Sequence, residues 1–236
     1  MIEIKSMSKF YGKKQVLHNL NLTIDDMSNN IYALVGANGA GKTTILKVLA
    51  GIYIDDKHSI SSTQCNEADY NVWARDNIAY VAADNRVLYM KNSIWDNIMY
   101  FACLKGASPK KVKENFLKYS EYIEFSVPLS YKVEQLSYGN QKKVCLMSAL
   151  CADMKVFLLD EPSIGLDIDT INEFCKLLLI LSTDYQKTII ISSHDMDFVS
   201  KIANFYIFIT NGTCVCEIEK EMNLDEIYRV YESLKK

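Results

Sequence analysis

The chain has 236 residues, of which 49% are hydrophobic and 23% are charged, and both shares are typical of a folded domain. Its 26 basic and 29 acidic residues give a formal net charge of −3, so there is no overall basic field to recruit nucleic acid. No apolar run approaches the ~20 residues that a membrane-spanning helix needs, and the N-terminus lacks the apolar core of a signal peptide. We therefore expect a chain that is itself soluble, with one α/β domain and a subdomain, or two small domains.

Seven cysteines, an odd number, are spread through the sequence without C-x-x-C spacing. Their neighbours are largely apolar, so we predict reduced and mostly buried thiols in a cytosolic chain. Cys214 and Cys216 form a C-x-C pair, and alternation along a strand would place both on one face. Metal binding by this pair is the disfavoured interpretation.

The first 24 residues alternate between apolar and polar side chains and predict two antiparallel strands joined by a turn at 11–14. Residues 25–30 form a polar loop. The apolar members of the two strands are Ile2, Ile4, Leu20, Leu22 and Ile24. We expect one face of this pair of strands to be exposed to solvent, because the turn at its end is charged.

The next stretch, Gly36-Ala37-Asn38-Gly39-Ala40-Gly41-Lys42-Thr43, fits the phosphate-binding pattern G-x-x-x-x-G-K-[ST]. Its glycines allow several backbone N–H groups to point into one concavity. Lys42 adds positive charge towards the β/γ-phosphates, and the Thr43 hydroxyl is suited to ligating Mg²⁺.

The flanking sequence decides between this interpretation and a glycine-rich turn with an incidental lysine. Residues 31–35 predict a buried strand before the loop, and residues 44–50, which begin with Thr44, predict an amphipathic helix after it, with Gly51 as the C-cap. A helix N-terminus that faces the loop favours an anion. We therefore predict a nucleoside triphosphate site.

The middle of the chain is predicted to be helical. Residues 54–77 are polar and weakly patterned and predict short strands and loops, whereas 78–82 predict a core strand. Ser93-x-x-Asp96 resembles a capping box that opens one helix, and Ser108-Pro109 opens a second, which Val127-Pro128 ends. The apolar stripes of both helices are interpreted as core, and their members are Ile94, Ile98, Phe101, Ala102 and Leu104, then Val112, Phe116, Tyr119 and Ile123.

A third helix is predicted from about Tyr138 to Ala152. Its inward face is Val144, Met147, Leu150 and Cys151. It follows the stretch Leu136-Ser137-Tyr138-Gly139-Asn140-Gln141, which puts a serine at the N-cap and a glycine in the first turn. A hydroxyl, backbone N–H groups and the helix dipole together make an anion site, although a plain helix cap is the alternative.

The α/β pattern resumes after residue 153. The apolar run 156–159 predicts a parallel strand covered on both faces, and Asp160 and Glu161 follow at its carboxyl end, where ligands bind in open α/β sheets. Asp160 is suited to holding Mg²⁺ and Glu161 to accepting a proton from an attacking water, with a solvated strand end as the alternative. A helix at 170–182, a strand at 187–192, a hairpin at 205–218 turning on Asn211-Gly212 and a tail helix at 223–235 complete the prediction.

These motifs together resemble those of ATP-binding cassette (ABC) proteins over about residues 1–215. Residues 136–141 resemble the family's LSGGQ signature, with Ser137 and Gly139 kept and with Tyr138 and Asn140 in place of Gly and Gln. The resemblance implies the fold: an α/β P-loop NTPase with a mainly parallel core sheet, an antiparallel β subdomain at the N-terminus and an inserted α-helical subdomain. It implies an ATP-binding domain at 1–220, with helices inserted at about 86–152, and a short helical tail at 221–236.

The resemblance also implies roles for further residues. Tyr11 occupies the place of the aromatic residue that stacks on adenine, and Gly165, Leu166 and Asp167 lie in the D-loop that links two active sites. His194 matches the switch histidine that contacts the γ-phosphate, although a histidine after a strand is usually structural. The family further implies a homodimer or heterodimer, with ATP between residues 36–44 of one subunit and residues 137–139 of the other.

The family normally has a glutamine at about Ala83, which ligates Mg²⁺ and couples the nucleotide to the membrane partner. Alanine can do neither, so Asp84 or the pair Thr43 and Asp160 with water would have to hold the ion. Divergent cassettes of ABC-2-type exporters resemble this segment. We therefore expect an ATPase subunit at the inner face of the cell membrane that powers export through a separate transmembrane permease.

Two other functions stay open at this point. One is a soluble ABC ATPase that acts on a cytosolic protein, for example in iron–sulfur assembly. The other is a regulatory module that binds nucleotide without hydrolysing it, against which Glu161 argues. A groove between the strand at 78–82 and the helices at 93–125 is where a permease helix would insert, and Trp95, Tyr89 and Tyr100 are candidates for its lining, with core burial as the alternative for Trp95.

Overall fold

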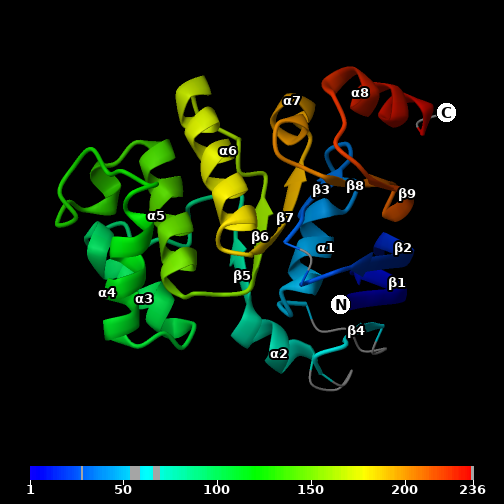
Figure 1. The fold of residues 1–236 in the computed structure, drawn as a ribbon. Helices are drawn as coiled ribbons and strands as arrows, with labels where there is room; N and C mark the ends of the chain where they lie inside the picture. Colours follow the sequence, from blue (N-terminus) through cyan, green and yellow to red (C-terminus); the bar gives the residue numbers. More distant parts are fainter. Residues whose placement is uncertain (28, 54–58, 66–69, 235–236) are drawn as a thin grey trace.

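A computed structural model describes residues 1–27, 29–53, 59–65 and 70–234. Its larger sheet has the strand order β5-β6-β7-β3-β8-β9, in which the first five strands are parallel and β9 is antiparallel to β8 (Figure 1). The predicted mainly parallel core sheet is thereby confirmed. Its strands are β3 (Ile31–Val35), β5 (Ile78–Val81), β6 (Val156–Asp160), β7 (Thr188–Ser193), β8 (Phe205–Thr210) and β9 (Thr213–Glu219).

The N-terminal residues form a separate antiparallel sheet with the order β2-β1-β4, as the alternation predicted for its first two strands. Its strands are β1 (Ile2–Tyr11), β2 (Lys14–Ile24) and β4 (Ile60–Ser62). All five apolar residues predicted to face inward, from Ile2 to Ile24, are buried.

The core sheet is covered on both faces, which explains why its strands are continuous apolar runs. Along β3, Tyr32 and Leu34 pack in the cluster shared with the smaller sheet and α1 (Lys42–Leu49). Ala33 and Val35 pack in the cluster on the opposite face, with helices α3 to α8. Figure 1 shows α1 between the two sheets and the helical layer on the other side of the core sheet.

Three helices between β5 and β6 form a compact helical unit at the left of Figure 1. The capping box of Ser93 and Asp96 is present, with the Asp96 N–H donating to Ser93 Oγ at 3.0 Å, and Ser108 caps the second helix through the Lys111 N–H. The helices are α3 (Ile94–Leu104), α4 (Pro109–Tyr119) and α5 (Tyr138–Cys151), with a short 3₁₀ helix, η2 (Val133–Gln135), before α5.

Several helix predictions were wrong in detail. Residues 70–77 form helix α2 (Tyr70–Asn77) instead of strands and loops. The helix was missed because only Tyr70 and Ala74 are buried, and two positions are too few to show a helical pattern. Residues 54–58 and 66–69 of the same prediction lie outside the described residues. Helix α4 ends at Tyr119, well before Val127-Pro128. Leu104, the last residue of α3, is 69% exposed and is not part of the core as predicted.

The C-terminal half contains α6 (Ile168–Thr183), α7 (Met196–Ser200) and α8 (Leu224–Ser233). The short helix α7 was not predicted. The hairpin of β8 and β9 turns at Asn211 and Gly212, which both have positive φ, as predicted. Residue 235, the predicted end of the tail helix, lies outside the described residues. The C-cap of α1 is Ala50, and Gly51, which was predicted as the C-cap, is the next residue.

The cysteine predictions were partly wrong. All seven thiols are free, but only Cys151 and Cys175 are fully buried. Cys214 and Cys216 do not share a face, because Phe208 pairs with Cys216 and Ile209 with Cys214, which leaves one extra residue in β9. This bulge turns Cys214 towards the cluster between the sheets and Cys216 towards the helical layer, so the two thiols do not lie on one face to bind a single metal ion.

Candidate functional site

The phosphate-binding loop connects β3 to α1 at the carboxyl end of the core sheet. Gly36 has no room for a side chain, since a Cβ atom would lie 2.4 Å from the Ile209 carbonyl oxygen. Gly41 has a φ of +105°, which favours glycine, and α1 begins there without a side-chain cap. Each other α-helix with a described N-cap is capped by a side chain, and these residues are Ser93, Ser108, Ser137, Asp167, Asp195 and Asn223. The N-terminus of α1 is therefore built to receive an anion.

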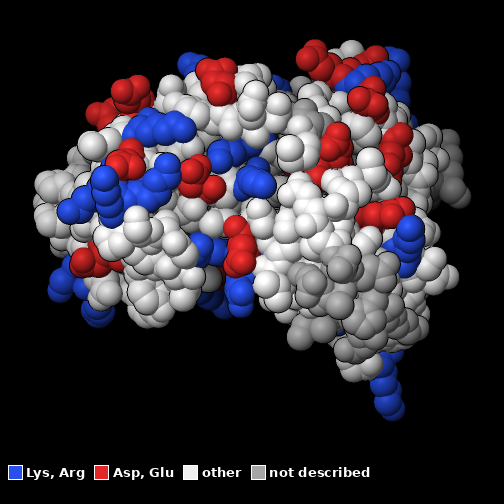
Figure 2. Space-filling model, turned by 60° about the horizontal axis from the view of Figure 1, so that its bottom comes forward, with Lys and Arg blue, Asp and Glu red and all other residues white. Residues whose placement is uncertain are grey.

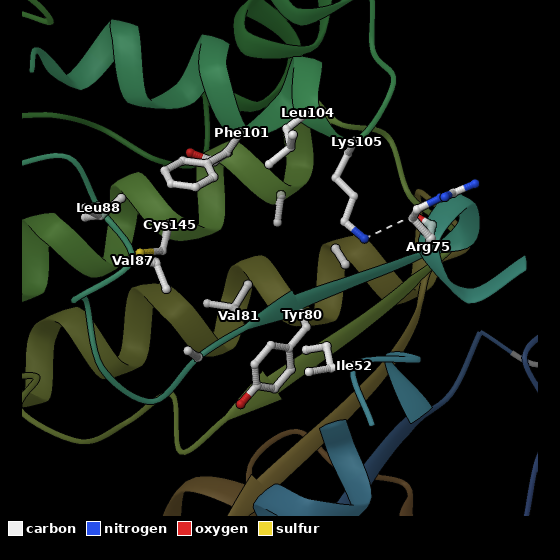
Figure 3. A pocket seen from close by; sticks show the side chains of 14 residues that line it. Ile52, Arg75, Tyr80, Val81, Val87, Leu88, Phe101, Leu104, Lys105 and Cys145 are labelled. Atoms are coloured by element: carbon white, nitrogen blue, oxygen red, sulfur yellow. Dashed lines mark hydrogen bonds between the residues drawn. The ribbon is translucent and has the colours of Figure 1, made fainter. Parts of the chain in front are cut away.

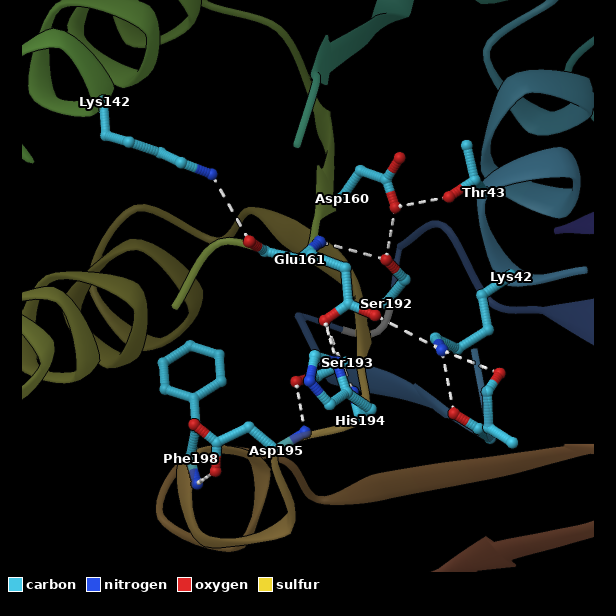
Figure 4. A network of polar contacts seen from close by, with 12 residues as sticks. Lys42, Thr43, Lys142, Asp160, Glu161, Ser192, Ser193, His194, Asp195 and Phe198 are labelled. Carbon is cyan, nitrogen blue, oxygen red and sulfur yellow. Dashed lines mark hydrogen bonds and ion pairs between the residues drawn. The ribbon is translucent and has the colours of Figure 1, made fainter. Parts of the chain in front are cut away.

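Lys42 is a buried cation, only 5% exposed, at the first position of α1. Its Nζ donates to the carbonyl oxygens of Gly36 at 2.8 Å and Ala37 at 3.3 Å, and it lies 3.2 Å from Glu161 Oε1 (Figure 4). A buried charge is tolerated where it is paired and hydrogen-bonded. The loop thus keeps a positive charge at its centre, where polyphosphate oxygens would lie.

Asp160 is the hub of a polar network at the ends of β6 and β7. The parallel register places it beside Ser192, whose Oγ donates to Asp160 Oδ1 at 2.6 Å. The Thr43 Oγ1 donates to the same oxygen at 3.0 Å, and the Tyr80 hydroxyl donates to Oδ2 at 3.0 Å. Burial, and then the charge of Asp160, raise the pKa of Tyr80 well above its ordinary value, so the hydroxyl stays a donor.

Glu161 lies between a lysine and a histidine. Its Oε1 faces Lys42, and its Oε2 lies 2.9 Å from His194 Nδ1 (Figure 4). The backbone at Glu161 has a φ of +45°, and its N–H donates to the carbonyl oxygen and the Oγ of Ser192. A carboxylate fixed in this way beside the phosphate loop can accept a proton from a water at a bound phosphate.

The donor set fits a magnesium ion. Thr43 and Asp160 supply a hydroxyl and a carboxylate within 3.0 Å of each other, and hard oxygen ligands of this kind suit Mg²⁺, which usually takes one or two carboxylates plus phosphates and water. Within the described residues no group of three His, Cys, Asp or Glu side chains forms a metal site of its own. The Asp84 carboxylate lies 3.7 Å from the Arg86 Nε and accepts from the Arg86 backbone N–H at 3.2 Å, and its part in holding the ion stays a prediction.

Ser137 caps α5 at the surface, with its Oγ accepting from the Asn140 N–H at 3.3 Å. Tyr138 turns back into its own chain, where its hydroxyl donates to the Ala83 carbonyl oxygen at 3.0 Å. Its ring covers Gly165, where an added Cβ would lie 2.8 Å from the ring. The structure therefore brings the predicted signature and D-loop residues together, although they are far apart in sequence.

Three other predicted residues lie at distinct places. Tyr11 ends β1 with 44% exposure, contacts Tyr53 edge-on at a centroid distance of 5.7 Å, and has its hydroxyl 3.4 Å from Thr44 Oγ1. The Leu166 side chain packs against Gly139, where an added Cβ atom would lie 3.4 Å from Leu166 Cδ2. Asp167 caps α6 by accepting from the Thr170 N–H at 2.8 Å.

Sequence reasoning missed three residues of the network. Ser192 could have been found, because both β6 and β7 were predicted as strands and the carboxyl ends of neighbouring parallel strands meet at one edge of the sheet. Tyr80 could not be singled out from the sequence, since tyrosine is common in β-strands. Lys142 on α5 is buried with its Nζ 3.3 Å from the Glu161 carbonyl oxygen, and burial lowers the pKa of this amine.

A buried lysine in a glycine loop, a carboxylate hub at the strand ends and a second capped helix define a nucleotide-binding site of the P-loop class. The sequence matches the family described as ABC transporter over residues 17–164. The chain belongs to this family, as an ATP-binding subunit with ATPase activity.

Relatives of similar length carry transport functions. The chain is 29% identical over 232 residues to the lantibiotic transport ATP-binding protein SrtF of Streptococcus pyogenes, covering 97% of this chain and 96% of that protein. It is 28% identical to the tungstate uptake system ATP-binding protein TupC of Peptoclostridium acidaminophilum, covering 89% and 95%. It is 29% identical to the SkfA peptide export ATP-binding protein SkfE of Bacillus subtilis, covering 90% and 86%.

Solved structures share the fold. An ATP-binding subunit of an ABC transporter superposes with a TM-score of 0.83 at 22% identity, covering 98% of this chain and 99% of that one. A dimeric ATP-binding cassette in a post-hydrolysis state, bound to ADP and Pi, gives a TM-score of 0.75 at 24% identity, covering 94% and 100%. The predicted P-loop fold with its antiparallel sheet and helices is confirmed.

Proposed function

We propose that the chain powers export through a separate transmembrane permease, at the cytoplasmic face of the membrane, by hydrolysing MgATP. None of the described helices is long and apolar enough to span a bilayer, so the transport path in this proposal belongs to another chain. The proposal divides the chain into an ATP-binding domain at 1–220, with helices inserted at 86–152, and a tail at 221–236.

The observation that carries the proposal is an apolar pocket of about 530 Å³ between β5 and helices α3 and α5 (Figure 3). Phe101 and Leu104 form its helical wall, and Tyr80 and Val81 form its strand wall. Ile52 and Val87 extend the apolar surface around it and are each more than half exposed. Exposed apolar surface of this extent marks an interaction site, and a concave apolar site suits the apolar side of a helix from a partner.

The charge distribution supports a protein partner at this face. Figure 2 shows basic and acidic side chains mixed over the helical half of the face, with uncharged surface beside them. Such a mixture offers no single-sign field for a polyanion. Tyr89 and Tyr100 contact Phe101 next to the pocket, whereas Trp95 packs edge-on against Phe116 within the helical unit.

The proposed active unit is a dimer with two ATP molecules at its interface. In each site residues 36–44 and Tyr11 of one subunit bind the nucleotide, Thr43 and Asp160 hold Mg²⁺, and Glu161 with His194 act on the attacking water. Ser137, Tyr138, Gly139 and Asn140 of the other subunit complete the site, and Gly165, Leu166 and Asp167 connect the two. Support comes from the exposure of the Ser137 cap and from the dimeric cassette with the same fold.

Two of the relatives support export as the proposed direction. SrtF is matched over almost its entire length, and SkfE serves peptide export. An ABC-2-type exporter of a peptide or similar compound is therefore the proposed system, while the tungstate relative keeps uptake as the competing direction.

The test is recovery of the permease with the ATP-bound chain. A tagged Glu161→Gln chain, loaded with ATP and Mg²⁺, is purified from gently solubilised source cells, and its companions are identified by mass. A polytopic membrane protein in stoichiometric amount supports the proposal. Recovery of soluble proteins alone would replace it with a cassette that acts on a soluble partner.

A matched pair of leucines tests the pocket as the contact. Leu104 on the pocket wall is 69% exposed and Leu117 on α4 is 70% exposed, so replacing either by glutamate costs the free chain equally little. Leu104→Glu is expected to lose the permease while Leu117→Glu retains it. Equal retention by both variants would move the docking site away from the pocket.

A further inference from the structure

Tyr80 belongs to two regions at once. Its ring forms part of the pocket wall (Figure 3), and its hydroxyl donates to Asp160 Oδ2 at 3.0 Å. The other carboxylate oxygen, Oδ1, accepts from Ser192 and Thr43. The two oxygens of Asp160 are therefore fixed from opposite sides, one by the phosphate-loop side and one by the pocket side.

Other groups near the pocket do not provide this link. Ala83 has no polar side chain, and its carbonyl oxygen accepts from Tyr138 instead. Asn85 donates to the Tyr138 carbonyl oxygen, and Lys105 donates to the carbonyl oxygens of Arg75 and Ile78. Each of these contacts fixes backbone around the pocket, whereas Tyr80 reaches the carboxylate that fits Mg²⁺.

We propose that Tyr80 is a positioning residue that orients Asp160 for Mg²⁺ and transmits occupancy of the apolar pocket to the metal site. The part of this inference that concerns the pocket rests on the proposed function, whereas the part that concerns Asp160 does not. Groups that hold a metal-binding side chain from behind set its orientation, and removing them weakens metal binding.

The physical basis is the rigidity of the tyrosine side chain. Its ring and hydroxyl move as one body on two rotatable bonds, so a group that pushes into the pocket against the ring also shifts the hydroxyl relative to Asp160. The contact lies in a largely buried network, where a charge-assisted hydrogen bond is stronger than in water. Binding in the pocket and binding at the metal site are then thermodynamically linked.

The first test uses Tyr80→Phe, which removes the hydroxyl and keeps the ring. In a Glu161→Gln background, binding of a fluorescent ATP analogue is titrated with Mg²⁺ and repeated in EDTA. The Mg²⁺ concentration for half-maximal binding is expected to rise about 10-fold, with affinity in EDTA unchanged. Unchanged Mg²⁺ dependence would overturn the positioning role.

A control separates this effect from a general loss of stability. Tyr206 on β8 is fully buried, and its hydroxyl donates to the Ala203 carbonyl oxygen at 3.0 Å. Tyr206→Phe likewise removes one hydrogen bond donated by a tyrosine hydroxyl, here to a backbone carbonyl far from the metal site, and is expected to leave the Mg²⁺ titration unchanged. A shift of the same size in both variants would assign the effect to stability and overturn the proposal.

The second test measures the link to the pocket with 1-anilinonaphthalene-8-sulfonate as the probe, an anionic dye whose aromatic rings bind apolar sites. Ala149 lines the pocket, so Ala149→Phe fills it and identifies the part of the dye signal that comes from this site. Dye bound there is expected to change the Mg²⁺ dependence of nucleotide binding in the parent but not in Tyr80→Phe. An identical dye effect in both would overturn transmission through Tyr80.

The outcomes separate this inference from the proposed function. If no permease is recovered but Tyr80→Phe shifts the Mg²⁺ dependence, the positioning role of Tyr80 is supported and the proposed permease partner is not. If a permease is recovered but Tyr80→Phe causes no shift, the permease partner is supported and the positioning role of Tyr80 is rejected.

Discussion

Helices α1 and α5 both begin at predicted nucleotide-binding residues, but their N-termini are built differently. α1 begins at Gly41 without a side-chain cap and faces the network of Asp160 and Glu161 in its own chain. α5 begins at Ser137, which caps its own helix at the surface. One N-terminus thus lies beside a network of charged and polar side chains in its own chain and the other lies at the surface, which is the arrangement expected if each chain supplies half of a shared site.

The two ends also differ in what holds them. The α1 end contains a buried lysine that its own loop carbonyls and Glu161 compensate. The α5 end is held from behind, through the Tyr138 ring on Gly165 and the Tyr138 hydroxyl on Ala83. A self-contained charged site and a surface cap fixed by packing respond differently to mutation, and the following predictions use this difference.

The largest effect is expected at the α1 side. Glu161→Gln removes the proton acceptor while keeping the size of the side chain, so the ATPase rate is expected to fall about 1,000-fold with ATP binding retained. Phosphate release and fluorescent-nucleotide binding measure the two quantities. A Glu161→Gln chain that hydrolyses ATP at the parental rate would remove this residue from the role of base.

The α5 side is expected to act on the other subunit. Ser137→Ala should lower ATPase activity about 100-fold, as loss of one phosphate-facing donor does, without weakening nucleotide binding by the isolated chain. Lys42→Ala should abolish binding in its own chain.

Mixing these two inactive variants tests the shared site. Each mixed dimer keeps one site with an intact Lys42 and an intact Ser137, so a 1:1 mixture is expected to recover about a quarter of the parental sites. No recovery over either variant alone would place both residues in the same subunit's site.

The packing behind α5 gives a smaller effect, on stability. Gly165 has a φ of +76° and the Tyr138 ring at 2.8 Å from a would-be Cβ, whereas Gly106 has a φ of +93° and nothing within 4 Å. Gly106→Ala is expected to lower the free energy of unfolding by about 1–2 kcal/mol through backbone strain alone. Gly165→Ala should cost more.

Urea unfolding of Gly165→Ala with and without Tyr138→Ala measures the contact between the two residues. The cost of Gly165→Ala beyond that of Gly106→Ala is expected to disappear in the double variant. A cost that persists without the Tyr138 ring would mean that the ring does not restrict this position.

The smallest effect is expected at the cap of α6. The Thr170 N–H and hydroxyl lower the pKa of Asp167, so its folded value lies below the unfolded value and its charge stabilises the fold at neutral pH. Asp167→Asn keeps a good cap but loses the charge, so its melting temperature should lie slightly below that of the parent at pH 7. The difference should vanish as pH falls through the folded pKa of Asp167, and a difference independent of pH would contradict the charge argument.

Elements whose geometry depends only on residues close together in the sequence could be predicted from the sequence. The loop at 36–43, the capping box of Ser93 and Asp96, and the Asn211-Gly212 hairpin follow from local backbone requirements. Helix α2 was missed because two buried residues give too weak a pattern over eight positions. The bulge that separates Cys214 from Cys216 depends on pairing with β8, which the alternation of β9 alone does not contain.

The sequence by itself determined the fold class and most of the proposed site, because each motif couples glycine geometry, helix capping or a strand end to a charged group within a few residues. Only the tertiary structure decided which groups meet across the sheet. Parallel register brings Ser192 to Asp160, strand β5 brings Tyr80 to the same carboxylate, and the helical unit brings Tyr138 onto Gly165. These contacts join residues tens of positions apart, and their geometry is set by the packing of whole elements.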